Sequence, residues 1–178
     1  MDVETISYLY SLPELYALIR LVGYAGIPCF PQKASLFEEG MDQLTASLLV
    51  SQAEQTVAVD KISAYLAKAV GSAEQFLCVT GDSYLGLFYS PAMTVFLELR
   101  KTRWHLTPYP EAPQALDAMM HALLRGALPE AVYIRCAGGQ WRRSCAEADN
   151  LSELVRTAAQ WVFNNQIPTG KDAVTWKP

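Results

Sequence analysis

Histidine and cysteine side chains are the groups of this sequence best suited to catalysis or metal binding. In the chain of 178 residues they are His105, His121, Cys29, Cys78, Cys136 and Cys145. A serine or cysteine nucleophile needs a neighbouring base and an orienting group, and neither histidine stands beside a serine or cysteine in such a pattern. The cysteines include no C-x-x-C pair, which zinc sites usually contain. We therefore predict no metal site and expect four reduced cysteines in the protein interior.

Carboxylates and glycine loops give no stronger indication of chemistry. Glu38 and Glu39 are adjacent and typical of a solvated helix end, while Glu98 stands alone among strand residues. The segment at Thr169, Gly170 and Lys171 lacks the first glycine and the strand–helix context of a phosphate-binding loop. The sequence therefore predicts a protein that is not an enzyme and holds no cofactor.

Basic residues gather at two hairpins. Arg100, Lys101 and Arg103 lie at one tip, and a second group lies on the last hairpin, with Arg142 and Arg143 in it. If glycines 138 and 139 form a two-residue turn, Arg135 faces Arg142, Cys136 faces Trp141 and Cys145 faces Val132. Like charges that face each other are destabilising, so an acidic group or partner is expected nearby. The alternative is that these bases protect sheet edges from pairing.

The first 75 residues combine helices with negative charge. A capping box at Ser11 and Glu14 begins the first helix. A short helical turn around residues 35–39 and a second helix over 41–49 are expected, then two short strands, the second at 56–59, and a helix through residue 70 that Asp60 can cap. Helix, turn, helix and hairpin is the order of a winged helix, so residues 10–72 are predicted to form a winged-helix-like helical subdomain; an irregular helical cap is the alternative. Residues 34–60 contain no Lys or Arg, which leaves no charge to neutralise phosphates. We predict no binding to duplex DNA.

Four apolar segments follow one another within residues 76–108. Because two or three residues separate them, they are antiparallel neighbours. A helix from Glu111 to Arg125, a hairpin, a helix from Asn150 and a loose tail over 164–178 complete the chain. We predict an α+β fold: an antiparallel meander sheet of four to six strands with helices packed on it. The chain would be one domain, 1–178, with a second subdomain over 75–165.

Composition narrows the compartment and the partners. Hydrophobic residues make up 51% of the chain, enough for a substantial core. Charged residues make up 18%, below the roughly 25% of soluble domains, so some apolar surface is expected to meet a partner or a second copy. No apolar run approaches the roughly 20 residues that cross a bilayer, and the acidic N-terminus lacks the basic region of a secretory signal. We expect a cytoplasmic protein without membrane contact.

One face of the third meander strand suggests where a partner binds. If Met93, Val95, Leu97 and Leu99 face the core, then Phe96 and Glu98 face outward. Exposed aromatic area bordered by Arg is typical of an interface hot spot. The predicted partner-binding residues are Phe96, Glu98, Arg100, Arg103, Trp104, Arg142 and Arg143. The alternative is that the helical N-terminal part covers Phe96.

Three features together resemble a known family: a leucine-rich first helix, the segment LLVSQAEQTVAVD followed by ISAYLAKAV, and a meander that ends in Trp104-His-Leu-Thr-Pro108. Over roughly residues 12–125 the chain resembles the cytoplasmic chaperones of ESX (type VII) secretion systems and related uncharacterised proteins of Gram-positive bacteria, although it is shorter. The resemblance implies recognition of a small helical secreted protein without catalysis and supplies no functional residue. We expect a non-enzymatic protein-interaction module that binds a protein partner or a second copy. The alternatives are a winged-helix-type regulator that binds nucleic acid and a small-molecule-binding protein with a pocket between sheet and helices.

Overall fold

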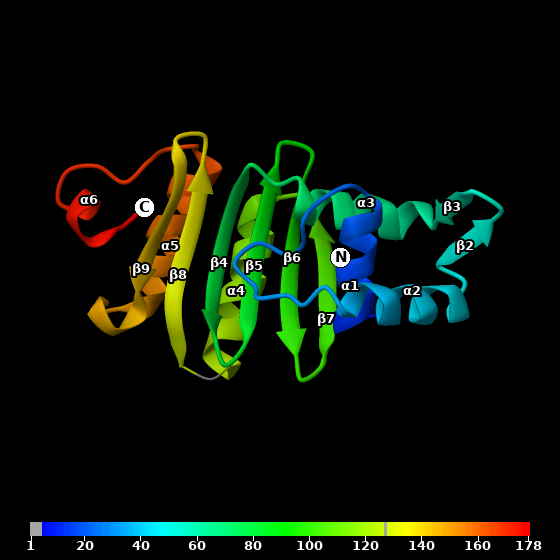
Figure 1. The fold of residues 1–178 in the computed structure, drawn as a ribbon. Helices are drawn as coiled ribbons and strands as arrows, with labels where there is room; N and C mark the ends of the chain where they lie inside the picture. The colour runs from blue at the N-terminus through cyan, green and yellow to red at the C-terminus, as the bar shows by residue number, and fades with distance from the viewer. Residues whose placement is uncertain (1–4, 127) are drawn as a thin grey trace.

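A seven-stranded antiparallel sheet with helices on both faces forms the body of the protein (Figure 1). The computed structural model describes residues 5–126 and 128–178. The sheet has the strand order β1-β7-β6-β5-β4-β8-β9. Its centre is the predicted meander, whose strands are β4 (Gln75–Gly81), β5 (Tyr84–Ser90), β6 (Met93–Arg100) and β7 (Arg103–Tyr109). Two residues separate each of these strands from the next, and links this short only join antiparallel neighbours. The predicted α+β class and meander are confirmed.

The sheet has seven strands, one more than the largest number predicted, because three strands add to the four of the meander. Strand β1 (Tyr8–Ser11) pairs with the outer edge of β7, and the hairpin of β8 (Pro129–Cys136) and β9 (Gly139–Ser144) joins the outer edge of β4. Strand β1 has four residues, too few to show a clear alternation of apolar and polar side chains in the sequence. Pairing with β7 supplies the backbone hydrogen bonds that make this segment a strand.

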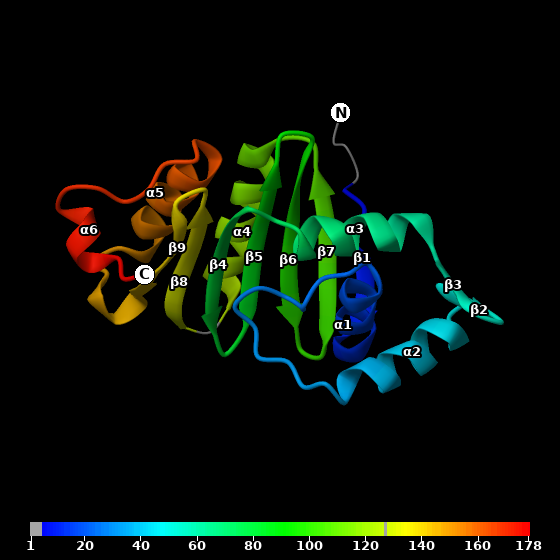
Figure 2. The same cartoon turned by 45° about the horizontal axis from the view of Figure 1, so that its top comes forward.

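The helical N-terminal portion is confirmed. Its elements are α1 (Leu12–Leu21), α2 (Leu36–Ala46), β2 (Val50–Ala53), β3 (Thr56–Val59) and α3 (Lys61–Gly71). Ser11 and Glu14 form the predicted capping box of α1, and the Asp60 side chain accepts from the Ser63 amide to cap α3. The sequence predicted a short turn followed by a helix over 41–49, whereas the structure has one continuous helix, α2, over residues 36–46. A long segment between α1 and α2, residues 22–35 and called the connector below, crosses the front of the sheet instead of making a tight turn (Figure 2). A winged-helix arrangement stays a prediction.

Each sheet face has its own apolar core. On the front face, α1, α3 and the connector bury Leu18, Val70, Phe88 and Trp104. On the rear face, α4 (Ala112–Arg125) and α5 (Leu151–Phe163) bury a second set, which comprises Leu77, Leu87, Phe96, Met119 and Val155. Figure 1 shows both rear helices behind the sheet. Two covered faces explain why β5 is apolar along nearly its whole length, as in buried sheets.

The C-terminal tail is ordered against the sheet, so the prediction of a loose tail over 164–178 is wrong. A short helix, α6 (Asp172–Thr175), precedes Trp176, which is buried with its ring centroid 5.5 Å from that of Trp161. The next residue, Lys177, exchanges two backbone hydrogen bonds with Arg142, at 2.6 and 2.9 Å. The tail therefore covers part of the open edge of β9, which removes an unpaired strand edge from solvent.

The register of the last hairpin also differs from prediction. The turn lies at residues 137 and 138, so Arg135 faces Gln140 and Cys136 faces Gly139. The expected opposition of Arg135 and Arg142 does not occur. Arg142 instead faces Tyr133, with its guanidinium carbon 5.5 Å from the ring centroid, a favourable cation–π arrangement. No acidic partner is needed to compensate this hairpin.

No helix within the described residues is both long enough and apolar enough to cross a membrane.

Candidate functional site

The two aromatic residues of the predicted partner surface are buried, which corrects that prediction. Phe96 is 4% exposed and packs in the rear core, while Trp104 is 0% exposed in the front core. Phe96 on β6 pairs with Thr107 on β7, so these two side chains lie on the same face of the sheet. Trp104 is three residues from Thr107 on the same strand, and because side chains alternate along a strand it points to the opposite face. The rear helices cover Phe96, and the connector covers Trp104: the Phe30 ring stands edge-on to it at 5.0 Å. Neither ring is available to a partner.

The four predicted arginines do not form one surface. Arg100 and Arg103 flank the exposed tip between β6 and β7. Arg142 and Arg143 lie on β9, four strands away from β6 in the sheet, a distance of about 19 Å at about 4.8 Å per strand. Successive residues of a strand also point to opposite faces, so Arg142 lies on the front and Arg143 on the rear. The sequence placed these residues correctly on hairpins, but they cannot bind one compact partner segment together.

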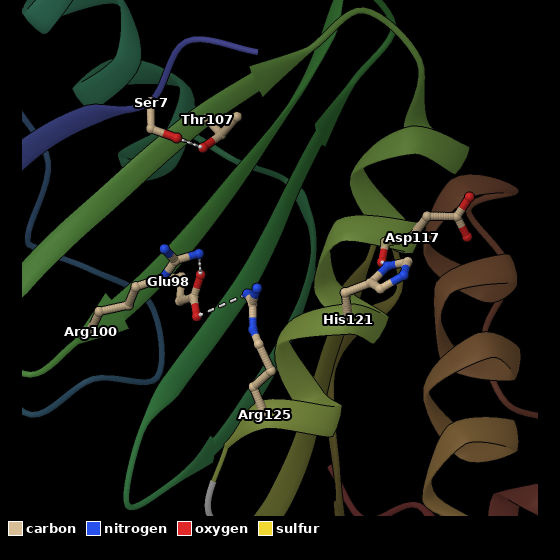
Figure 3. A network of polar contacts seen from close by, with 7 residues as sticks. All are labelled: Ser7, Glu98, Arg100, Thr107, Asp117, His121 and Arg125. Carbon is tan, nitrogen blue, oxygen red and sulfur yellow. Dashed lines mark hydrogen bonds and ion pairs between the residues drawn. The ribbon is translucent and has the colours of Figure 1, made fainter. Parts of the chain in front are cut away.

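Glu98 is the centre of a polar cluster on the rear face (Figure 3). It is 8% exposed and is the one charged side chain that is buried among the described residues. Its carboxylate oxygens lie 2.6 Å from Nη2 of Arg100 and 3.9 Å from Nη2 of Arg125, the last residue of α4. Close contact with the Glu98 carboxylate raises the pKa of Arg100. An ion pair to each side compensates the cost of burying this carboxylate, so Glu98 joins the end of α4 to the sheet.

The two histidines lie on β7 and α4, the elements beside this cluster. His105 faces Glu98 across β6 and β7. Partial burial is the main cause that lowers the pKa of His105; the positive charge of Arg100 lowers it further, and the negative charge of Glu98 raises it. His121 places Nδ1 2.7 Å from the carbonyl oxygen of Asp117 in its own helix (Figure 3). General acid–base catalysis requires a proton donor or acceptor within reach of a substrate. Glu98 is instead held by two guanidinium groups, which suits an ion-pair contact between strand and helix.

A second cluster, missed by the sequence reasoning, contains two cysteines. Cys29 in the connector lies beside Cys78 in β4, because the Tyr84 hydroxyl contacts both segments and donates to the carbonyl oxygen of Pro28 at 2.7 Å. The sulfur of Cys78 lies 3.1 Å from the Tyr84 hydroxyl oxygen, and Gln140 Nε2 donates to the sulfur of Cys29 at 3.4 Å. Hydrogen bonding with Cys78 is the main cause that lowers the pKa of Cys29, whereas burial raises the pKa of Cys78 well above its usual range. No short spacing in the sequence could have indicated this pair. All four cysteines are free thiols, but the predicted interior position is correct only for Cys78 and Cys136, since Cys29 and Cys145 are partly exposed.

Part of the N-terminal portion projects from the body of the protein. We call α2, β2, β3, the links between them and the first half of α3 the arm; Figures 1 and 2 show its hairpin projecting beyond the sheet. Strands β2 and β3 pair only with each other and are almost entirely exposed. Apolar side chains are exposed along the arm, namely Leu48, Val57, Ile62 and Tyr65. Leu48, 88% exposed, also has a positive φ of 62°, an unfavourable conformation for leucine.

Acidic residues accompany these apolar side chains. Glu38, Glu39, Asp42 and Glu54 are exposed on the arm, and residues 34–60 contain no base. Among the described residues the arm therefore combines negative charge with apolar groups that the chain itself leaves uncovered. Exposed apolar area with a polar surround is typical of an interaction surface.

Two hollows of the described structure lie between sheet and helices, one of about 370 Å³ between α3 and β5 and one of about 200 Å³ between β9 and α5, and both are open to solvent. The hollow between the sheet and α4, lined by Val79, Leu85 and Leu123, holds about 10 Å³, room for one water. The larger hollow of about 730 Å³ beside Leu128 and Arg142 is open to solvent. No three His, Cys, Asp or Glu side chains of residues 5–126 and 128–178 are grouped as a metal ion would require.

Comparison with known proteins adds no relative. No model of a known protein family matches the chain, and no curated protein matches it in sequence. The resemblance to the ESX secretion chaperones therefore stays a prediction.

Proposed function

We propose that this protein is a non-enzymatic protein-interaction module that binds a basic, apolar segment of a partner protein through its arm. The observation that carries the proposal is the exposure of Leu48 and Val57 on a projection whose residues 34–60 are acidic and free of bases. Apolar side chains supply binding energy when a partner covers them. Opposite charge on the partner speeds and orients the encounter.

The proposal moves the binding surface from the sheet to the arm. Burial of Phe96 and Trp104 removes the aromatic anchors of the sheet surface, whereas the arm keeps its apolar groups in solvent. The resemblance to ESX chaperones supports a small helical secreted protein as the partner, recognised in the cytoplasm before export. A helix with Lys or Arg beside an apolar stripe has the chemistry that complements the arm.

Substitution of the arm tests the proposal. Proteins captured on the full chain from a lysate of the source organism are identified, purified and titrated against wild-type and variant proteins by calorimetry. Leu48→Asn removes the exposed apolar group and keeps a residue that tolerates positive φ. We expect affinity to fall about tenfold or more, as for a hot-spot residue. Leu124→Asn is the matched control, because Leu124 is 80% exposed on α4, outside the arm.

Salt dependence provides a second measurement. Replacing Glu38 and Glu39 with Gln removes two exposed charges from α2, so binding of a basic partner becomes weaker and less sensitive to salt. Equal affinity of wild type and both arm variants contradicts the proposal. If no protein binds and a metabolite raises the melting temperature instead, the protein is a ligand-binding protein. Tight, salt-sensitive binding to duplex DNA in a gel-shift assay would indicate a nucleic-acid-binding regulator.

A further inference from the structure

Cys29 and Cys78 are neighbours, one on each side of the Tyr84 hydroxyl, although the two residues belong to different layers of the fold. Cys78 is completely buried in the middle of β4, and Cys29 is partly exposed in the connector that crosses the front of the sheet. The Tyr84 hydroxyl contacts both segments, at Pro28 beside Cys29 and at the sulfur of Cys78, and each thiol affects the pKa of the other. A disulfide bond of about 2.05 Å therefore requires only a local approach of the two sulfurs.

Hydrogen bonds and ring contacts hold the connector in this position on both sides of Cys29. Before it, the carbonyl oxygen of Pro28 accepts a hydrogen bond of 2.7 Å from the Tyr84 hydroxyl. After it, the Phe30 ring stands edge-on to the rings of Tyr84 and Trp104. The same Tyr84 oxygen lies 3.1 Å from the sulfur of Cys78. The surrounding side chains thus hold the connector at Cys29 against β4 at Cys78.

The two thiols differ in the way that a reactive and a resolving cysteine differ. Oxidants react with the thiolate, and they reach a partly exposed sulfur more readily than a buried one. Cys29 is partly exposed and accepts a hydrogen bond from Gln140 Nε2 at 3.4 Å, an interaction that favours its thiolate. Its pKa is lowered, whereas burial raises the pKa of Cys78. Cys29 therefore reacts first, and Cys78 stays a thiol until its neighbour is oxidised.

We propose that Cys29 and Cys78 form a reversible thiol–disulfide pair, in which a peroxide oxidises Cys29 and Cys78 then resolves the product. The Cys29 thiolate attacks one oxygen of hydrogen peroxide, the O–O bond breaks, and sulfenic acid and hydroxide form; hydroxide takes up the thiol proton as water. The sulfur of Cys78 then attacks the Cys29 sulfur, the S–O bond breaks, and a second water leaves. Two thiols and one peroxide thus give one disulfide and two waters. A dithiol reductant restores both thiols by exchange.

The bond would link the connector to β4 and close a loop from residue 29 to residue 78. That loop contains α2, β2, β3 and α3, and so the complete arm. Closing a loop restricts the unfolded chain more than the folded one, so the oxidised protein is expected to melt at a higher temperature. The inference does not depend on the proposed function, because oxidation and melting are measured without a partner.

Peroxide treatment of the purified full chain tests the pair. Before treatment, alkylation of the unfolded chain should modify all four cysteines. After treatment with hydrogen peroxide, we expect two modified sites to be lost, a cross-linked peptide that contains Cys29 and Cys78, and return of both sites after dithiothreitol. In Cys78→Ala, a dimedone probe should label a sulfenic acid at Cys29, because the resolving thiol is absent.

Two variants keep the test decisive if Cys78→Ala fails to fold. Cys29→Ser changes a partly exposed residue and should abolish both the cross-link and the rise in melting temperature. Cys145→Ser, which removes a partly exposed thiol outside the cluster, should leave both unchanged. A cross-link to Cys136 or Cys145, a bond between two chains, or oxidation of Cys29 no faster than that of Cys145 overturns the proposal.

Discussion

Gly40 lies where α1 and α2 cross, and replacing it with alanine tests the packing that orients the arm. A Cβ atom built at Gly40 would lie 2.1 Å from the carbonyl oxygen of Pro13 and 2.7 Å from Cβ of Ala17. Both contacts are far shorter than the 3.4 Å at which ordinary contact begins. The atom closest to the new methyl group belongs to the backbone of α1, so no side-chain rotation can relieve the overlap.

Two effects of opposite sign decide the stability of Gly40→Ala. Inside a helix, alanine is favoured over glycine by about 0.5–1 kcal/mol. Here the methyl group must displace α2 by about 1.3 Å from α1, and overpacking typically costs about 1–3 kcal/mol. The overlap is with backbone atoms, so we expect the second effect to be larger and the variant to be less stable by about 1–2 kcal/mol. For a chain of this size that lowers the melting temperature by about 2–8 °C.

Thermal unfolding followed by circular dichroism measures this difference. Gly126→Ala is the control, because its Cβ would lie 3.5 Å from the nearest atom, an ordinary contact; its melting temperature should change little. If Gly40→Ala melts at a higher temperature than wild type, helix propensity dominates and the close approach of α1 and α2 is wrong. A displaced α2 should also weaken partner binding through the arm, which separates this variant from a merely unstable one.

Two further predictions concern the sheet. Phe96→Ser should cost about 3 kcal/mol or more, as for loss of a buried aromatic, whereas Leu124→Ser at an exposed site should stay within about 0.5 kcal/mol of wild type; denaturant titration measures both, and a fully stable Phe96→Ser would return Phe96 to an exposed surface. The pKa of His105 is lower in the folded protein than its usual value of about 6.5, so the unfolded chain binds the proton more readily. The free energy of unfolding should therefore decrease as the pH drops below about 6.5. For His105→Gln it should decrease less than for wild type between pH 7.5 and 5. Parallel curves for the two proteins would contradict this reasoning.

Local signals in the sequence were sufficient for most elements. The capping box of Ser11 and Glu14, the Asp60 cap and the short links of the meander each act within a few residues, and each is present in the structure. Short links leave only one arrangement of neighbouring strands. For the same reason the hairpin of β2 and β3 was found, with β3 at the predicted residues.

The last hairpin shows where local signals end. Arg135 faces Arg142 in the predicted register and Gln140 in the observed one. A shift of two residues leaves every side chain on the same face of the sheet. Alternation of apolar and polar residues cannot distinguish them. Packing can, because the observed register sets Trp141 opposite Ile134, and both side chains contribute to the rear core.

The candidate sites depended on contacts between distant segments. The sequence determined that Phe96 and Leu97 point to opposite faces of the sheet, since alternation is a property of the strand itself. Only the tertiary structure decided that both faces are covered, that the tail covers part of the edge of β9, and that the connector places Cys29 beside Cys78. The sequence also determined the negative charge of residues 34–60, while the fold decided that these residues form a projecting arm (Figure 2). Charge and alternation belong to a short stretch of chain, whereas burial depends on what the rest of the chain places on top of it.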